Sequence, residues 1–430
     1  MFLKSTLVVS GLSILIQLIG FLKLLLIAHY FGVSTELDAY YLALVIPGLL
    51  LGFVGGALQT GFMPIYGSLI NKTLKDEAVN FRSHLFWILL LILVLICSLT
   101  SFFSENIIQL IAPLSSDEIK QYAGYALSIL VVTLALNVIA DFFGMILNMQ
   151  QQFFASAIAP VSNIIVSTLF LYLLPELGID NLIWGLVSGL SVQVLILWLV
   201  LHLQKINFVF SFSFKSPHLF RAWQLMLPIL FGVALANANL SVDQVMAAMA
   251  GDGAISLLGY ASRFQNVITQ TAIMGVSIVL LPSLIHLLSD NEIEKAFALM
   301  KRIFQWTLLF SLLLIAFVWL FGENLLNLLL SRGAFSVKDA SSVYNIWFLY
   351  ILGVFPMACG VFYAKFFQAM KKPRVITRLA FISFIMNVFF NYMFVGWFGV
   401  DGIALSTSMV YGIVLLLFYF ESKKLGDHFA

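Results

Sequence analysis

The sequence predicts an all-α polytopic membrane protein of about twelve transmembrane helices, arranged as two six-helix lobes related by a pseudo-two-fold axis along the membrane normal. Three observations lead to this prediction: the composition, a series of long apolar runs, and an internal repeat. Of 430 residues, 62% are hydrophobic and 10% are charged, whereas soluble domains are about 45–50% apolar and about 25% charged. A soluble fold has too little polar cover for this much apolar surface, so the expected solvent is lipid.

Twelve apolar runs are long enough to cross a bilayer, which takes about 20 residues of helix. The runs are continuous rather than alternating, which favours helices over the strands of a membrane barrel. The first run follows Lys4 and is too long for the apolar core of a signal peptide, so we interpret it as a span. The predicted spans are residues 6–28, 40–66, 84–103, 122–147, 154–174, 182–203, 222–249, 255–285, 303–321, 343–369, 376–396 and 402–420.

The basic residues predict the orientation. With both termini in the cytoplasm, seventeen of the 22 Lys and Arg residues fall in cytoplasmic segments, whereas Lys120, Arg332 and Lys338 fall on the other side. Lys and Arg concentrate on the cytoplasmic side of membrane proteins. We therefore expect cytoplasmic termini in a bacterial inner membrane.

The two halves of the chain carry matching motifs. FFSEN at 102–106 matches LFGEN at 320–324, and Pro64 matches Pro282 at the same spacing, while GID at 178–180 matches GVD at 399–401 at nearly that spacing. An even number of spans per half gives both halves the same orientation. The predicted division is an N-terminal lobe at 1–204, a cytoplasmic linker at 205–221 and a C-terminal lobe at 222–430. Two such lobes favour an alternating-access transporter over a structural duplication or a channel.

Other classes of function lack support in the sequence. A net charge of +2 gives no field that would attract nucleic acid. There is no GxxxxGK[ST] stretch for a nucleotide, and no nucleophile, base and orienting group recur together, so we expect neither an enzyme nor a cofactor. Cys97 and Cys359 lie in apolar runs, which favours buried thiols over a disulfide or a metal site.

Four ionisable side chains lie within predicted spans, where a charge must face a cavity or a partner: Lys23, Asp141, Asp243 and Arg263. Asp243 and Arg263 flank the turn AGDGA at similar heights, so an ion pair between them is reasonable. Such a pair is either structural or holds a cavity cation for a ligand. Lys23 and Asp38 flank the turn after the first span in a similar way. Asp141 and Asp243 are candidates for a proton or cation site.

Several amide side chains follow the hairpin that carries Asp243 and Arg263. They either line a polar cavity or form hydrogen bonds between helices. These residues are Asn237, Asn239, Gln244, Gln265 and Gln270.

Three stretches of the sequence resemble the MurJ/MviN-type lipid II flippases. They are GFLKLLLIAHYFGVSTELDAYYLALVIPGLLLGFVGGALQTGFMPIY, VDQVMAAMAGDGAISLLGYASRFQNVITQTAIMGVSIVLLPSL and LLNLLLSRGAFSVKDA. The likeness covers most of the chain. It implies membership of the multidrug/oligosaccharidyl-lipid/polysaccharide exporter superfamily, with two six-helix lobes around a cationic central cavity that moves an undecaprenyl-pyrophosphate-linked sugar outward.

The resemblance also implies which side chains bind substrate. Lys23 stands where the family usually has a cavity arginine, and Asp38 matches the aspartate of its TDAF-like motif. Arg263 matches the arginine of a YADR-like motif in which Ser262 replaces the aspartate, and Gln17 replaces another usual arginine. With Asp243 and Asn237 from the hairpin, these residues form the predicted substrate site.

The family pattern changes at further positions. Leu51 and Gly52 lie where an arginine pair is common, and Gly56 lies near the usual glutamate. The sequence ends after its twelfth predicted span, where lipid II flippases commonly add two helices.

The leading hypothesis is a flippase for a polyprenyl-diphosphate-linked glycan, from peptidoglycan, O-antigen or another surface polysaccharide. A diphosphate in a low-dielectric site needs cations, which Lys23 and Arg263 would supply. The expected partners are the lipid-linked glycan, the bilayer, a coupling cation, and a glycan polymerase or glycosyltransferases. One alternative is a cation-coupled drug or metabolite antiporter, with Asp141 or Asp243 as its ion site. Another is a non-transporting scaffold of a glycan-assembly complex.

Overall fold

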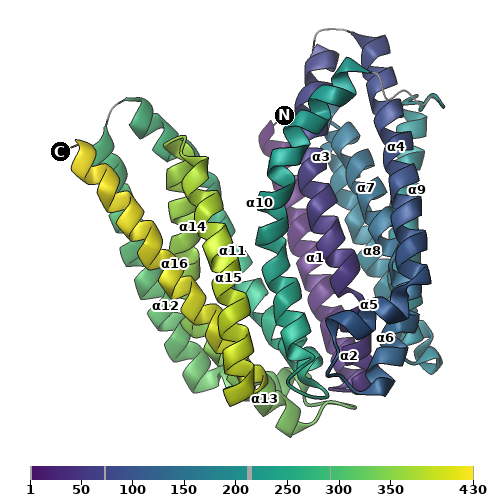
Figure 1. Ribbon diagram of the computed structural model, residues 1–430, viewed down its shortest axis with the longest axis vertical. Helices are drawn as coiled ribbons and strands as arrows, with labels where there is room; N and C mark the ends of the chain where they lie inside the picture. Colours follow the sequence, from purple (N-terminus) through teal and green to yellow (C-terminus); the bar gives the residue numbers. More distant parts are fainter. Residues whose placement is uncertain (1, 72–73, 211–215, 291, 430) are drawn as a thin grey trace. The chain divides into compact units, whose positions relative to one another are not determined.

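The computed structural model describes residues 2–71, 74–210, 216–290 and 292–429, and it describes their side chains except at 2–10, 13–14, 71, 228–237, 240, 270–272, 274, 278 and 425–429. Over these ranges the chain is helical and contains no strand. Figure 1 shows long helices joined by short connections. In a bilayer, this arrangement satisfies every backbone donor and acceptor within its own segment.

The first half of the chain, over its described residues, forms nine α-helices and a short 3-10 helix. The order is α1 (Phe2–Phe31), α2 (Thr35–Ala43), α3 (Val45–Asn71), α4 (Lys75–Phe102), α5 (Ser104–Ile111), α6 (Asp117–Leu130), α7 (Val132–Met149), α8 (Phe153–Leu173), η1 (Pro175–Leu177) and α9 (Asp180–Leu203).

The second half forms seven helices within the described ranges, which are on average longer. They are α10 (Pro217–Ala247), α11 (Ala254–Ser289), α12 (Ile293–Leu330), α13 (Val337–Leu352), α14 (Val354–Ala369), α15 (Pro373–Phe398) and α16 (Val400–Phe429). The local sequence explains where two of these helices begin. Ser336 and Asp339 form a capping box at the start of α13, and Pro373 occupies the first turn of α15.

Each predicted span falls on one helix or on a pair of helices with a short break. The pairs are α2 with α3, α6 with α7, and α13 with α14. Among the described residues, eight helices are long and apolar enough to cross a membrane, or nine when α13 and α14, bent by 43°, count as one span. The predicted spans on α1, α10 and α11 contain side chains outside the described set.

The chain forms two compact units. Unit 1 comprises Met1–Phe31 and Thr35–Asn237, and unit 2 comprises Gly32–Ser34 and Ala238–Ala430. In unit 1, Phe62 packs against Tyr66, Phe81 and Phe142 with ring centroids 4.7–5.8 Å apart. The core of unit 2 includes buried aromatic side chains of α14 and α16. Within the units, α8 packs along α9 and α15 along α16 (Figure 1).

The boundary between the units lies within α10, whereas the predicted lobes are separated by residues 205–221. Leu219, Ala222 and Met226 of α10 belong to the core of unit 1. Gly61 on α3 permits this packing, because a Cβ there would clash with Met226. The seventh predicted span is therefore shared between the two units.

A short turn between α1 and α2 packs with unit 2. The Tyr260 hydroxyl donates to the Gly32 carbonyl at 2.9 Å, and the Ser256 hydroxyl lies 3.4 Å from the Ser34 carbonyl. Gly32 has a φ of +56°, and a Cβ at this position would clash with the carbonyl of Ala334. Residue 32 therefore has both a conformational and a steric reason to be glycine.

The internal repeat is visible in the backbone. Residues with positive φ recur at nearly one spacing along the chain, at corresponding connections: Gly32 with Gly253, Gln151 with Lys371, and Gly178 with Gly399. A left-handed residue is uncommon in general, so three matched pairs are a strong sign of a shared backbone plan. The duplication therefore extends to the connections between helices.

Candidate functional site

Lys23 makes a polar contact inside unit 1. Its half-buried ammonium group on α1 donates a hydrogen bond of 2.9 Å to the hydroxyl of Ser167 on α8. Ser167 is buried, and its own hydroxyl lies 3.2 Å from the carbonyl of Ile164. Gly20, one turn earlier on α1, lies close to Ile164, so the two helices approach closely here. The cation is therefore held between two helices.

The other predicted substrate residues differ in exposure. Asp38 on α2 is completely buried, at 0% exposure. Arg263 on α11 and Gln17 on α1 are exposed. The side chain of Asn237 lies outside the described residues.

Asp141 on α7 faces a glycine of α3. A Cβ at Gly55 would lie 3.8 Å from the carboxylate of Asp141, so the glycine leaves room for this acid. The side chain is exposed, and in the part of the chain that the structure describes its carboxylate accepts no hydrogen bond. Asp141 therefore lacks the fixed partners expected of a preformed ion site.

Asp243 on α10 is the best-formed polar centre of unit 2. It is 6% exposed, and one carboxylate oxygen accepts hydrogen bonds from the amides of Asn387 at 3.1 Å and Asn391 at 2.6 Å, both on α15. The other oxygen lies 3.5 Å from the hydroxyl of Thr407 on α16. Tyr350 lies close enough to interact electrostatically with this carboxylate. Three helices thus converge on one buried acid.

The Asp243 cluster contains more hydrogen-bond acceptor sites than donor hydrogens. The single hydroxyl proton of Thr407 also points to the Ile403 carbonyl, at a shorter 2.9 Å, which leaves the second oxygen of Asp243 weakly bonded. The Asn391 amide oxygen is buried and has no partner among the described residues. Hydrogen bonding therefore leaves a buried negative charge incompletely compensated, which is costly.

The predicted ion pair between Asp243 and Arg263 is wrong. Asp243 is buried and bonded to neutral donors on α15 and α16, whereas the Arg263 side chain is exposed. Counting from the turn predicts the heights of the two residues along their helices. It gave no information on the direction in which each side chain points around the helix axis.

Sequence reasoning missed Asn387, Asn391, Thr407 and Ser167. A usable signal was present, because Asn387 and Asn391 are four residues apart and so share one face of an otherwise apolar helix. Of the predicted amides, Gln265 is buried, with a side-chain oxygen that has no partner within the described residues. The described residues contain no group of three or more His, Cys, Asp or Glu side chains that would hold a metal.

The chain is similar to known lipid flippases over nearly its whole length. The family model described as "Lipid II flippase MurJ" matches residues 27–429. A probable lipid II flippase MurJ of Buchnera aphidicola subsp. Baizongia pistaciae is 24% identical, with 97% of this chain and 82% of that protein covered. One of Rhizobium meliloti is 27% identical, with 98% and 80% covered.

Solved structures agree with the sequence comparison. A structure described as lipid II flippase MurJ in an inward closed conformation matches with a TM-score of 0.84 and 25% identity, covering 97% of this chain and 87% of that one. An inward-facing multidrug resistance MATE family transporter of the MOP superfamily matches with a TM-score of 0.80, 16% identity and 94% coverage of each chain. The second match concerns the fold alone. Together they confirm the predicted class of an all-α polytopic membrane protein.

Proposed function

Because the chain belongs to the lipid II flippase MurJ family, we propose that it moves a polyprenyl-diphosphate-linked glycan precursor from the cytoplasmic to the outer leaflet by alternating access. The observation that carries this proposal is the family match over residues 27–429, together with the 25% identical flippase structure. Lipid II is the first candidate substrate, and a related surface polysaccharide precursor is the second.

Lys23 and Arg263 would bind the diphosphate, each supplying one positive charge. Lys23 is already held at its ammonium group by Ser167, so little side-chain entropy remains to be lost on binding. An ammonium group is a point charge, whereas a guanidinium group binds phosphate oxygens in pairs. Three further residues complete the proposed set. Gln17 and Asn237 would make neutral contacts to the substrate, and the Asp38 carboxylate would orient the cations.

We propose a monovalent cation, with Na⁺ as first candidate, at the Asp243 cluster. Hard cations bind oxygen ligands. The Asp243 carboxylate lies 3.5 Å from the Thr407 hydroxyl, and Asn391, whose amide nitrogen donates to this carboxylate, has a buried oxygen without a partner among the described residues. One carboxylate balances one positive charge, so a monovalent ion would give a neutral buried complex. Asp141 ranks second as a coupling site, because it has no comparable set of oxygen neighbours among the described residues.

The Asp243 cluster also favours one alternative, a cation-coupled antiporter that carries a drug or metabolite. The two functions differ in their dependence on Lys23. A flippase needs this cation for the diphosphate, whereas an antiporter needs the carboxylate and tolerates the loss of Lys23.

The test is accumulation of lipid-linked glycan on the inner leaflet in cells that depend on each variant. We expect Lys23→Gln and Arg263→Gln to block export by at least tenfold, since about 1.4 kcal/mol of lost binding already gives that factor. Lys23→Arg should support export. Normal export by both neutral variants would show that Lys23 and Arg263 do not hold the diphosphate, and the carboxylates of Asp141 and Asp243 would be the next residues to test.

Orientation and partners belong to the same proposal. The termini and residues 205–221 would lie in the cytoplasm of a bacterial inner membrane, and glycosyltransferases or a glycan polymerase would act with the protein. A cysteine at Ser216 should resist an impermeant thiol reagent in intact cells, and a cysteine at Ser116 should react. Reaction at residue 216 from outside would reverse the orientation.

A further inference from the structure

Three adjoining cavities lie along helix α12 of unit 2. Slot 1 lies between α11, α12 and α14 and has a volume of about 450 Å³. Slot 2 lies between α12, α14 and α16 and has a volume of about 650 Å³. The third cavity, which we call the basic saddle, covers α12 around Lys301 and Arg302 and has a volume of about 520 Å³.

Shared side chains connect the three cavities. Trp306 lines both the basic saddle and slot 1, while Lys301 and Gln305 line both the saddle and slot 2. The two slots therefore diverge from one charged entrance, on either side of the same helix.

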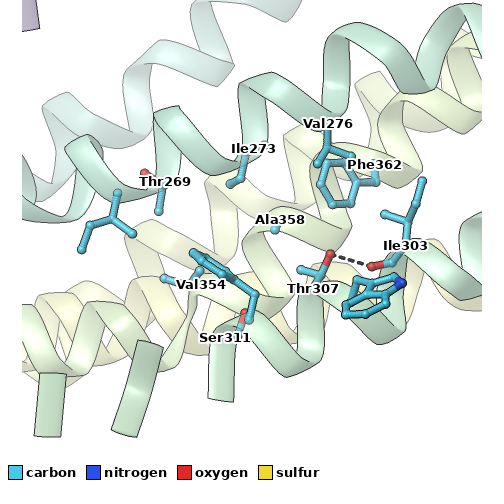
Figure 2. A pocket seen from close by; sticks show the side chains of 12 residues that line it. Thr269, Ile273, Val276, Ile303, Thr307, Ser311, Val354, Ala358 and Phe362 are labelled. Atoms are coloured by element: carbon cyan, nitrogen blue, oxygen red, sulfur yellow. Dashed lines mark hydrogen bonds between the residues drawn. The ribbon is translucent and has the colours of Figure 1, made fainter. Parts of the chain in front are cut away.

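Slot 1 is lined mostly by apolar side chains, together with the hydroxyl groups of Thr269, Thr307 and Ser311. Figure 2 shows Ile273 and Val276 of α11 and Ala358 and Phe362 of α14 around it. The Thr307 hydroxyl, which also lines the slot, donates to the Ile303 carbonyl of its own helix at 2.8 Å (Figure 2). Its hydrogen-bonding capacity is thus used within the helix, and the slot suits a hydrocarbon chain.

The entrance is positively charged without matching carboxylates. No Asp or Glu is among the described residues that line the three cavities. Over the described ranges, Lys301, Arg302 and Lys423 form no ion pair, although the neighbouring Lys295 and Lys424 pair with Glu292 and Glu421. The entrance therefore has positive charge available for an anionic ligand.

The entrance also lies at the expected height of a membrane surface. Residues 303–322 of α12 contain no charged side chain. Twenty helical residues are about 30 Å long, which equals the thickness of the hydrocarbon core. Lys301 and Arg302 then lie at one surface of that core. Trp306, 63% exposed, lies one turn inside, where tryptophan is commonly found in membrane proteins.

We propose that this groove binds one anionic diacyl phospholipid of the surrounding bilayer. The phosphate contacts Lys301 and Arg302, one acyl chain enters slot 1 and the other enters slot 2. Basic pockets between transmembrane helices on the cytoplasmic side bind anionic headgroups in this way. Two slots below one charged entrance match a lipid with two chains. A polyprenyl diphosphate, which has one chain, would leave a slot unfilled.

The test is lipid binding to the purified full-length protein in a non-ionic detergent. Native mass spectrometry would count bound lipid while phosphatidylglycerol, phosphatidylcholine with the same chains, single-chain lysophosphatidylglycerol or a polyprenyl diphosphate is titrated. We expect one tightly bound phosphatidylglycerol, and at least tenfold weaker binding of each of the others at this groove. Equal binding of the zwitterionic or the single-chain lipid would overturn the proposal, as would preferential binding of the polyprenyl diphosphate.

Two sets of variants locate the site. Each surface cation should contribute about fivefold, so the Lys301→Gln/Arg302→Gln double variant should bind phosphatidylglycerol about 25-fold more weakly. The exposed Lys371→Gln/Lys372→Gln pair, which lines none of the three cavities, is the matched control and should stay within about twofold. Equal effects of the two pairs would show that charge attracts lipid without a defined site.

Blocking a slot tests the acyl chains separately from the headgroup. Val276→Trp fills the mouth of slot 1, and Val279→Trp, one turn further along α11 at a more exposed position, leaves the slot open. We expect at least tenfold weaker phosphatidylglycerol binding for Val276→Trp alone. Unchanged binding in a folded Val276→Trp protein, judged by gel filtration and circular dichroism, would contradict an acyl chain in slot 1.

Discussion

Lys23 in unit 1 and Asp243 in unit 2 occupy equivalent positions of the repeat, but they carry opposite charges. The spacing from Lys23 to Asp243 equals the spacing from Ser167, the partner of Lys23, to Asn387, a donor to Asp243. The helix pair α1 and α8 in unit 1 thus corresponds to α10 and α15 in unit 2. In each pair, a polar contact joins the two helices at the same place in the repeat.

The surroundings of the two positions have diverged. Thr407 and Asn391 of unit 2 correspond, at the same spacing, to Val187 and Leu171 of unit 1. Unit 2 therefore places amide and hydroxyl side chains around its carboxylate, whereas unit 1 has apolar side chains at the positions that match Asn391 and Thr407. A duplicated backbone thus carries a lysine in one copy and a buried carboxylate in the other, which is the site where we propose that a cation binds.

The largest expected effect separates the two sites by their response to Na⁺. At a Na⁺ concentration of about 100 times its Kd, the ion should stabilise the folded protein by about 2.7 kcal/mol. We expect Asp243→Asn to lose this stabilisation and Lys23→Gln to keep it. The measurement is thermal unfolding in detergent in NaCl and in choline chloride of equal ionic strength. Retention of the Na⁺ effect by Asp243→Asn would place the ion elsewhere, with Asp141→Asn as the next variant to test.

The second prediction concerns a variant in which the cation of unit 1 is replaced by a carboxylate, as found in unit 2. Lys23→Asp places a carboxylate beside Ser167 without the amide and hydroxyl neighbours that Asp243 has in unit 2. We therefore expect this variant to destabilise the protein by about 2 kcal/mol and to create no second Na⁺ site. Chemical denaturation with and without Na⁺ measures both effects. A new Na⁺-dependent stabilisation in this variant would show that the polar neighbours of Asp243 are not needed to bind the ion.

A smaller effect is expected from the partner of Lys23. Ser167→Ala removes the acceptor of the 2.9 Å hydrogen bond, which should cost about 1 kcal/mol of stability. Ser162→Ala, on the same helix, is the control, because the Ser162 hydroxyl bonds to the Ala159 carbonyl of its own helix. The two variants should differ in unfolding free energy. Equal values would mean that the Lys23 contact adds nothing to stability.

The smallest effect tests the absence of an Asp243–Arg263 pair. Residues that do not interact give additive effects on stability within about 0.5 kcal/mol. We expect this additivity for Asp243→Asn and Arg263→Gln in a double-mutant cycle of unfolding free energies. A coupling above about 1 kcal/mol would show that the two side chains interact despite their different burial.

The fold was largely predictable because lipid imposes a simple rule on sequence. A segment that crosses the bilayer must be apolar, helical and about 20 residues long, so the apolar runs located the eight or nine spans that are found among the described residues. The breaks within spans were not predicted. Those at Val131 and Gly353 lie inside apolar runs, where hydropathy does not change.

The candidate site was only partly predictable. Lys23 and Asp243 stood out because a charge in an apolar run is rare. Their partners did not, because Ser167 and Thr407 are common in membrane helices and often bond to their own backbone. Which helices pack together is a tertiary property, and without it Asp243 was assigned to Arg263 on the adjacent helix rather than to Asn387 on α15.

The turn at Gly32–Ser34 bears on any attempt to divide this protein into fragments. A cut at the boundary in α10 would yield a second fragment, 238–430, that lacks the three residues packed against Tyr260 and Ala334. The Tyr260 hydroxyl would lose its acceptor, and the space around the turn would be open. We therefore expect residues 238–430 alone to be less stable than the complete unit 2. Separately expressed halves would need this short piece of the first half to complete the second.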